Sequence, residues 1–373
     1  MTLPTSCCRS APVSSASIEA KTLGEGTSQT RLFSIDLVRA VAAFAVICIH
    51  TVPSDVQSTV HWLACTPSQI VTQLARFAVP FFFLTSGFFL AKGMLRTPPL
   101  SLLARYARRL GVLYLAWVCI YAVAPDPHGV LHLGLMPAMS NATWSRIATM
   151  REDPWGILQH GYEIHLWFFP SLLVGAFALA VATALRQDRI LLGVGVICYV
   201  LAVLRSSYVE TPIGLRLWEQ VGNGPLLAIA YVPAGFLIAH CRRVSTRTAW
   251  FTILLGIGLH FGEVFSLQYF SGRPISQNDF VFSTPLLGIG ALLLATSRDQ
   301  FRFPGSDCLA TIGTCGLGIY VSHILIRPWM FMLWKFVPDP RFWAIAAPFL
   351  LFALAAVFTL LLRRVPVARR LVS

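Results

Sequence analysis

The chain has 373 residues, of which 56% are hydrophobic and only 12% are charged, and its mean hydropathy is +0.68. Soluble domains carry about 25% charged residues, so this composition excludes an ordinary soluble enzyme and indicates a polytopic membrane protein. The net charge of +13 would suit a nucleic-acid partner, but the basic residues are spread among the connections between apolar segments. We therefore expect no nucleic-acid binding.

Apolar segments close to 20 residues long follow one another along the chain, and such a segment crosses about 30 Å of hydrocarbon as a helix. With the N-terminus in the cytosol, most Lys and Arg residues fall on the cytosolic side, as the positive-inside rule requires. The sequence predicts an all-α fold of about ten transmembrane helices with both termini in the cytosol. The predicted spans are about 33–52, 70–91, 109–125, 165–185, 189–205, 223–240, 249–269, 281–297, 309–330 and 342–362.

Three regions are expected along the chain. Residues 1–30 are rich in Ser, Thr, Ala and Gly and have no apolar run of the signal-peptide kind, so they predict a disordered cytosolic tail. Residues 31–365 form the ten-helix membrane domain, in which the long outer connection 126–163 has room for a lid or a small amphipathic element. Residues 366–373 predict a basic cytosolic tail.

The first apolar segment contains three ionisable residues, Asp36, Arg39 and His50. A helix turns by about 100° and rises by about 1.5 Å per residue, so Arg39 and His50 share one face about 16 Å apart along the axis. Ionisable groups in a membrane span mark a pathway or a reaction centre by default. The alternative is that Asp36 neutralises Arg39 near one membrane surface and His50 ends the helix at the other.

The second segment contains Pro80, which kinks or opens a helix, and the small residues Ser86 and Gly87, which allow a close approach by another backbone or a ligand. No G-x-S-x-G motif surrounds Ser86, so a packing role is favoured over that of a nucleophile. The third segment begins with a basic cluster, which is either a membrane-surface anchor or a phosphate clamp, because Arg binds phosphate oxygens in a bidentate way. The cluster consists of Arg105, Arg108 and Arg109.

Two later segments also contain polar residues. The fourth begins with Glu163, His165 and Trp167, which predict either an acceptor-binding site or a solvated rim at the outer surface. The ninth contains Tyr320 and His323 one helical turn apart, where a hydrogen-bonded structural histidine is favoured over a functional one. His128 and His132 have i,i+4 spacing, but Pro127 and Gly129 disfavour a helix there and no carboxylate accompanies them, so we expect no metal.

In this order and at these spacings, the motifs resemble the acyltransferase 3 family of bacterial ten-helix membrane O-acyltransferases. The matching motifs are Asp36 and Arg39 with His50, the run from Pro80 to Gly87, the arginine cluster, His165 to Phe168, and Tyr320 to His323. The resemblance covers about residues 31–365, and we expect the form of the family that has no fused esterase-like domain.

The resemblance implies transfer of an acyl group, most often acetyl, from cytosolic acyl-coenzyme A to a hydroxyl group, with acyl-CoA as a co-substrate and no permanently bound cofactor. His50 matches the catalytic histidine, as base or as acyl relay, and Arg39 the essential arginine. Arg105 and Arg108 match the family's basic R-x-x-R motif, whereas alignment on Arg109 would place Tyr106 at its first position. Asp36, Ser86, Tyr320 and His323 are expected to support the site, and Glu163, His165 and Trp167 to bind the acceptor.

The expected acceptor is a cell-surface glycan or exopolysaccharide on a lipid-linked precursor, modified at the bacterial inner membrane beside the polysaccharide assembly machinery. A second interpretation is a transporter or flippase of an anionic or lipid-linked substrate, because intramembrane Arg, Asp and His also line transport pathways. No inverted repeat with matched broken helices supports it. A glycan polymerase, which would need a larger outer loop, ranks third.

Overall fold

The computed structural model describes residues 16–52, 66–216, 223–297 and 302–372, with the side chains of the first helix described from Phe33 onward. Within these residues every regular element is helical and none is a strand, as the all-α prediction requires. The first half contains α1 (Ala16–Thr51), α2 (Pro67–Ala75), α3 (Ala78–Met94), α4 (Pro99–Val123), α5 (Pro127–Leu133), α6 (Leu135–Glu152), α7 (Pro154–His160), α8 (Phe168–Ala184) and α9 (Asp188–Arg205). The second half contains α10 (Gly224–His240), α11 (Thr246–Ser271), η1 (Ile275–Gln277), α12 (Thr284–Ala295), α13 (Ser306–Gly313), α14 (Gly316–Phe331), η2 (Met332–Lys335), α15 (Pro340–Arg364) and α16 (Pro366–Arg369).

Each predicted apolar segment coincides with a helix or a helix pair. Among the described residues, six stretches are long and apolar enough to cross a membrane by length and composition, and three shorter apolar helices accompany them. The six stretches are Phe33–Thr51, Pro67–Met94, Pro99–Leu133, Thr246–Ser271, Gly316–Lys335 and Pro340–Arg364, and the shorter helices are α8, α10 and α12. The chain is therefore a multi-helix membrane protein, while ten spans and cytosolic termini remain predictions.

The second predicted span is divided by Pro80. Helix α2 ends at Ala75 and α3 begins at Ala78, so the break falls four residues before the proline. Proline has no N–H to donate to that carbonyl and its ring crowds the preceding turn, which explains why the chain opens here. The predicted effect of Pro80 is confirmed.

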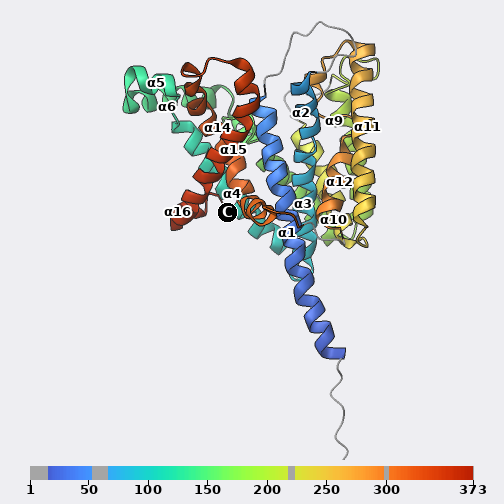
Figure 1. Cartoon of the computed structure of the whole chain (residues 1–373). Helices are drawn as coiled ribbons and strands as arrows, with labels where there is room; N and C mark the ends of the chain where they lie inside the picture. The colour runs from blue at the N-terminus through green and yellow to red at the C-terminus, as the bar shows by residue number, and fades with distance from the viewer. Residues whose placement is uncertain (1–15, 53–65, 217–222, 298–301, 373) are drawn as a thin grey trace, which may run out of the picture.

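Helix α10 lies inside the bundle and packs against α3, α8 and α9, while α11 runs along one flank (Figure 1). The crossing of α3 and α10 depends on two glycines. A Cβ at Gly87 would lie 1.9 Å from the Val232 carbonyl oxygen, and one at Gly235 would lie 1.9 Å from that of Leu84. The predicted close backbone approach at Gly87 is thus confirmed, and α10 is the helix that approaches.

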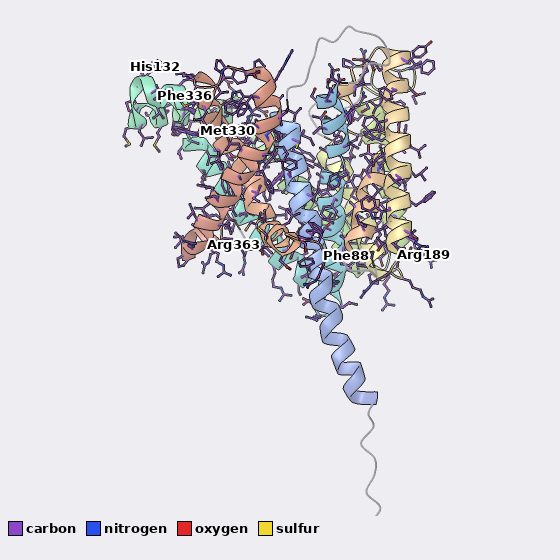
Figure 2. The ribbon with its side chains drawn as sticks, viewed as in Figure 1. Phe88, His132, Arg189, Met330, Phe336 and Arg363 are labelled. Atoms are coloured by element: carbon purple, nitrogen blue, oxygen red, sulfur yellow. The ribbon has the colours of Figure 1, made fainter. Side chains whose placement is uncertain are left out.

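Helix α1 packs against α13, α14 and α15 on one side and against α2 and α3 on the other. The bundle has two ends, which we name by their helices. The α5–α7 end contains the outer connection, and the α3–α4 end contains the link between α3 and α4 (Figure 1). Phe88, Arg189 and Arg363 lie toward the α3–α4 end, and His132 and Phe336 toward the other (Figure 2).

The predicted N-terminal tail differs from the structure. Helix α1 is already formed at Ala16, so residues 16–30 are helical where a disordered tail is expected, because Ala, Glu, Lys and Leu in this stretch favour a helix. The basic tail expected at 366–373 forms α16 and then turns back into the bundle. The Trp117 indole donates to the Leu371 carbonyl at 2.8 Å, and Val372 is fully buried. Burial of these apolar side chains offsets the cost of ordering the tail.

Candidate active site

Arg39 and Asp36 form an ion pair on α1, with Arg39 Nη1 at 2.8 Å from Asp36 Oδ1. Their side chains are 30% and 17% exposed, so the pair lies partly inside the bundle. The guanidinium of Arg39 also lies 4.9 Å above the centre of the Phe89 ring on α3. The neutralising contact expected of Asp36 therefore forms, but it leaves most of the guanidinium's hydrogen-bond donors for other partners.

A cavity of about 470 Å³ opens beside this pair. Polar side chains at its wall include Arg39, Ser86, Tyr106, Arg109 and Thr314, and its remaining lining is mostly Phe and Leu from α3, α4, α8 and α14. Ser86 donates its hydroxyl proton to the Phe82 carbonyl at 2.8 Å. The cavity combines two fixed positive charges with long apolar walls.

The arginines of the predicted basic cluster differ in position. Arg109 lines the cavity together with Tyr106, one turn earlier on α4. All three arginines are exposed, but Arg105 and Arg108 do not line the cavity, and Arg105 Nη2 donates to the Thr97 hydroxyl at 2.9 Å. The geometry thus favours the register in which Tyr106 and Arg109 occupy the motif positions.

Three aromatic rings close the inner end of the cavity. Phe82, Phe168 and Tyr320 all line it, with ring centres 5.6 to 6.5 Å apart. The Tyr320 hydroxyl donates to the His165 carbonyl oxygen, which holds this wall in place. His50 lies beyond the wall and does not line the cavity.

Beyond the wall, three histidines from separate elements come together. The ring centre of His323 lies 5.3 Å from that of His50 and 5.2 Å from that of His165. His165 and His323 are 1% and 0% exposed, so a solvated rim is the wrong interpretation for His165. It precedes α8, where the turn at 163–167 directs it into the bundle. We call this group, His50, His165 and His323, the histidine cluster.

The other two residues predicted to bind the acceptor lie apart from each other in the structure. Glu163 lies near the α5–α7 end, where its Oε1 accepts from Arg146 Nη2 at 3.0 Å. Burial raises the pKa of the Glu163 carboxyl, and the nearby Arg146 charge opposes that rise. The Trp167 ring packs against Phe83 and Phe168 in the core instead, so the structure does not bring it to the histidine cluster.

Sequence reasoning missed two residues at this site. Arg327 Nη1 donates to the His50 carbonyl at 3.0 Å, and its charge acts on His50, His165 and Glu163. Its place four residues after His323, on the same face of α14, was the available signal. Tyr121 packs its ring 5.5 Å from that of His165 and donates to the Val321 carbonyl at 2.9 Å. Nothing in the sequence around Tyr121 distinguished it.

Comparison with known proteins decides the family. A family described as an acyltransferase domain, acyltransferase 3, matches residues 32–363, which is most of the chain. The chain belongs to the acyltransferase 3 family. The cavity and the histidine cluster therefore lie in a membrane acyltransferase. In the part of the chain that the structure describes, no group of three or more His, Cys, Asp and Glu is arranged to hold a metal ion.

A more distant similarity links this acyltransferase to a protein of Enterococcus faecalis named an amino-acid racemase. The two are 25% identical over 323 residues, which is 79% of this chain and 42% of the relative. Because this chain spans less than half of that protein, the relative's name transfers no activity to it. No solved structure matches the chain.

Proposed function

We propose that this acyltransferase transfers an acyl group, most simply acetyl, from acyl-coenzyme A to a hydroxyl group of a cell-surface glycan or exopolysaccharide. The donor enters from the α3–α4 end, which we take to face the cytosol of a bacterium, and the acceptor approaches from the α5–α7 end. The observation that carries this proposal is the cavity, which runs from Arg39 and Arg109 to Tyr320, the residue in contact with the histidine cluster.

The cavity suits the shape and charge of coenzyme A. Arg39 and Arg109 provide two guanidinium groups, which bind phosphate oxygens in a bidentate way. The apolar walls beyond them accommodate the slender pantetheine arm. The axial distance of about 16 Å from Arg39 to His50 is one that such an arm spans. The acyl group then lies against the aromatic wall, and the side chain of Tyr320 has to turn aside for His50 to meet the thioester.

At the histidine cluster His50 acts as the general base. It removes the proton of the acceptor hydroxyl while the hydroxyl oxygen attacks the thioester carbonyl carbon. The carbon–sulfur bond then breaks, and His50 returns the proton to the leaving thiolate, so the products are an ester and coenzyme A with a free thiol. Imidazole suits both steps because its ordinary pKa lies near neutrality.

The acceptor side is supported by the polar groups at the α5–α7 end. Glu163 pairs there with Arg146, and Arg327 donates to the His50 carbonyl of the histidine cluster. An acceptor on a lipid-linked precursor would remain in the membrane and present its sugar to this end. Acetyl is preferred over succinyl because it is the commoner acyl group in the family.

The decisive test is transfer of label from acetyl-coenzyme A in membrane vesicles that contain the wild type or His50→Ala and crude lipid-linked glycans. We expect base-labile labelled product with the wild type and none with His50→Ala. Full turnover by His50→Ala would refute the role of His50. No transfer by folded wild type with several acyl donors would favour the transporter interpretation, in which substrate crosses the membrane without covalent change.

A matched pair of variants tests the donor site. Arg109→Ala should raise the KM for acetyl-coenzyme A, because it removes a cavity charge. Arg108→Ala, an identical change one residue away on the exposed surface, should leave that KM close to the wild-type value. Equal effects of the two variants would show that the cavity is not where the donor phosphates bind.

A further inference from the structure

Two members of the histidine cluster are held by backbone carbonyls in a defined orientation. His323 Nδ1 lies 2.7 Å from the Tyr320 carbonyl oxygen, and His165 Nε2 lies 3.4 Å from the Val321 carbonyl oxygen. A carbonyl only accepts hydrogen bonds, so each of these nitrogens carries the ring proton. In the neutral imidazole the other nitrogen is then an acceptor. These acceptors are Nε2 of His323 and Nδ1 of His165.

Neither acceptor nitrogen has a hydrogen-bond partner among the described residues, although both side chains are buried. Buried polar atoms are nearly always paired in native proteins, and an exception calls for an explanation such as a bound molecule. A third buried histidine provides the comparison. His260 is fully buried, and its Nε2 and Nδ1 lie 2.9 Å from Gln73 Oε1 and 3.4 Å from Thr284 Oγ1. His260 therefore has a partner for both ring nitrogens, whereas His165 and His323 each have one buried nitrogen without a partner among the described residues.

The surroundings limit what these nitrogens bind. A cation would also suit imidazole lone pairs, but Arg327 brings a positive charge to His50 and His165. No group of three or more metal-ligand side chains is arranged for an ion within the described ranges. The matching partner is a neutral molecule that donates hydrogen bonds from neighbouring positions, because the rings of His165 and His323 are in contact, with centres 5.2 Å apart.

We infer that His165 Nδ1 and His323 Nε2 bind two hydroxyl groups of the acceptor beside the hydroxyl that donates to His50. The acceptor class is then a polyol with neighbouring hydroxyl groups, such as an unsubstituted sugar ring, and not an isolated alcohol. This inference rests on the proposed function and assigns a task to the two histidines that the transfer chemistry does not use. His50 remains the base, and the proton follows the same path to the thiolate.

The first experiment alters the acceptor. Crude lipid-linked glycans are treated with periodate, which cleaves bonds between carbons bearing adjacent hydroxyls, and are then reduced with borohydride, which leaves a hydroxyl on each carbon. The enzyme should transfer much less label to the treated glycans than to the untreated ones, although the treated glycans still carry hydroxyl groups. Undiminished transfer to them would overturn the inference. Absence of transfer to untreated glycans would instead count against the proposed function.

The second experiment alters the histidines. His165→Leu and His323→Leu should each raise the KM for the glycan by roughly tenfold, the usual effect of one unpaired hydrogen bond in a site, with the KM for acetyl-coenzyme A unchanged. His165→Asn and His323→Gln, which place an oxygen acceptor close to the missing nitrogen, should recover part of the loss. His260→Leu is the matched control, and its KM for the glycan should stay at the wild-type value.

Three results would contradict the assignment. The first is an equal rise in both KM values in the Leu variants, which indicates a disturbed fold and not a lost acceptor contact. The second is the absence of any recovery in the Asn and Gln variants when their thermal stability matches that of the wild type. The third is a KM for the glycan that rises equally in His260→Leu.

Discussion

The aromatic wall at the inner end of the cavity should limit the length of the acyl group. Phe82 lies with its ring centre 6.3 Å from that of Phe168 and 6.5 Å from that of Tyr320, and all three rings line the cavity. Phe82→Ala removes one of the three rings and lengthens the apolar space. We expect this variant to accept longer donors, such as butyryl-coenzyme A.

The magnitude follows from the apolar surface that the longer donor buries. Each buried CH₂ group contributes about 0.8 kcal/mol, so the two extra CH₂ groups of butyryl contribute about 1.6 kcal/mol. This free energy corresponds to a factor of about 15. The ratio of kcat/KM for butyryl-coenzyme A to that for acetyl-coenzyme A should therefore rise by about that factor in Phe82→Ala.

In the assay the two donors compete for the enzyme. The acyl groups are then released from the ester product with base and separated. Phe83→Ala is the matched control, because Phe83 is the next residue on α3, is fully buried and does not line the cavity. Both substitutions should destabilise the fold by about 3–5 kcal/mol, but only Phe82→Ala should change the donor preference. An unchanged ratio in Phe82→Ala, or an equal change in Phe83→Ala, would refute the assignment of the wall.

Three further predictions concern the fold and its charges. Gly87→Ala should lower the melting temperature, because its Cβ would lie 1.9 Å from the Val232 carbonyl oxygen, whereas Gly193→Ala, with nothing within 4 Å, should raise it or leave it unchanged. Arg327→Gln should lower kcat and leave the KM for the donor unchanged, because Arg327 holds the carbonyl of His50 at the end of α1; a change confined to the donor KM would contradict this. Burial raises the pKa of Glu163 above its ordinary value of 4.5, so its protonated form is favoured in the fold, and the associated stability is present below pH 4.5 and is lost as pH rises through the raised pKa. The melting temperature of the wild type, compared with that of Glu163→Gln, should therefore fall as pH rises through this range. Identical pH profiles of the two melting temperatures would exclude the effect.

Much of the local structure follows from the sequence because it depends on short-range rules. Helix geometry places Arg39 and His50 on one face of α1 whatever surrounds them, and the ion pair of Asp36 with Arg39 needs only one turn of helix. Pro80 separates α2 from α3 because it has no backbone N–H to donate. Gly87 permits the close approach of α10 because it has no Cβ. The apolar segments similarly predict membrane helices from length and composition alone.

The candidate site was decided by tertiary packing, which no local pattern encodes. His165 is 1% exposed because the turn before α8 directs it toward α14, whereas Trp167, two residues later, packs into the core. Rotation of α4 places Arg109 in the cavity wall and leaves Arg105 and Arg108 outside it. The sequence by itself determined the family motifs and the helices that present them. Only the folded bundle determined which of these side chains meet, because those contacts join residues far apart in the chain and depend on how the helices are rotated against one another.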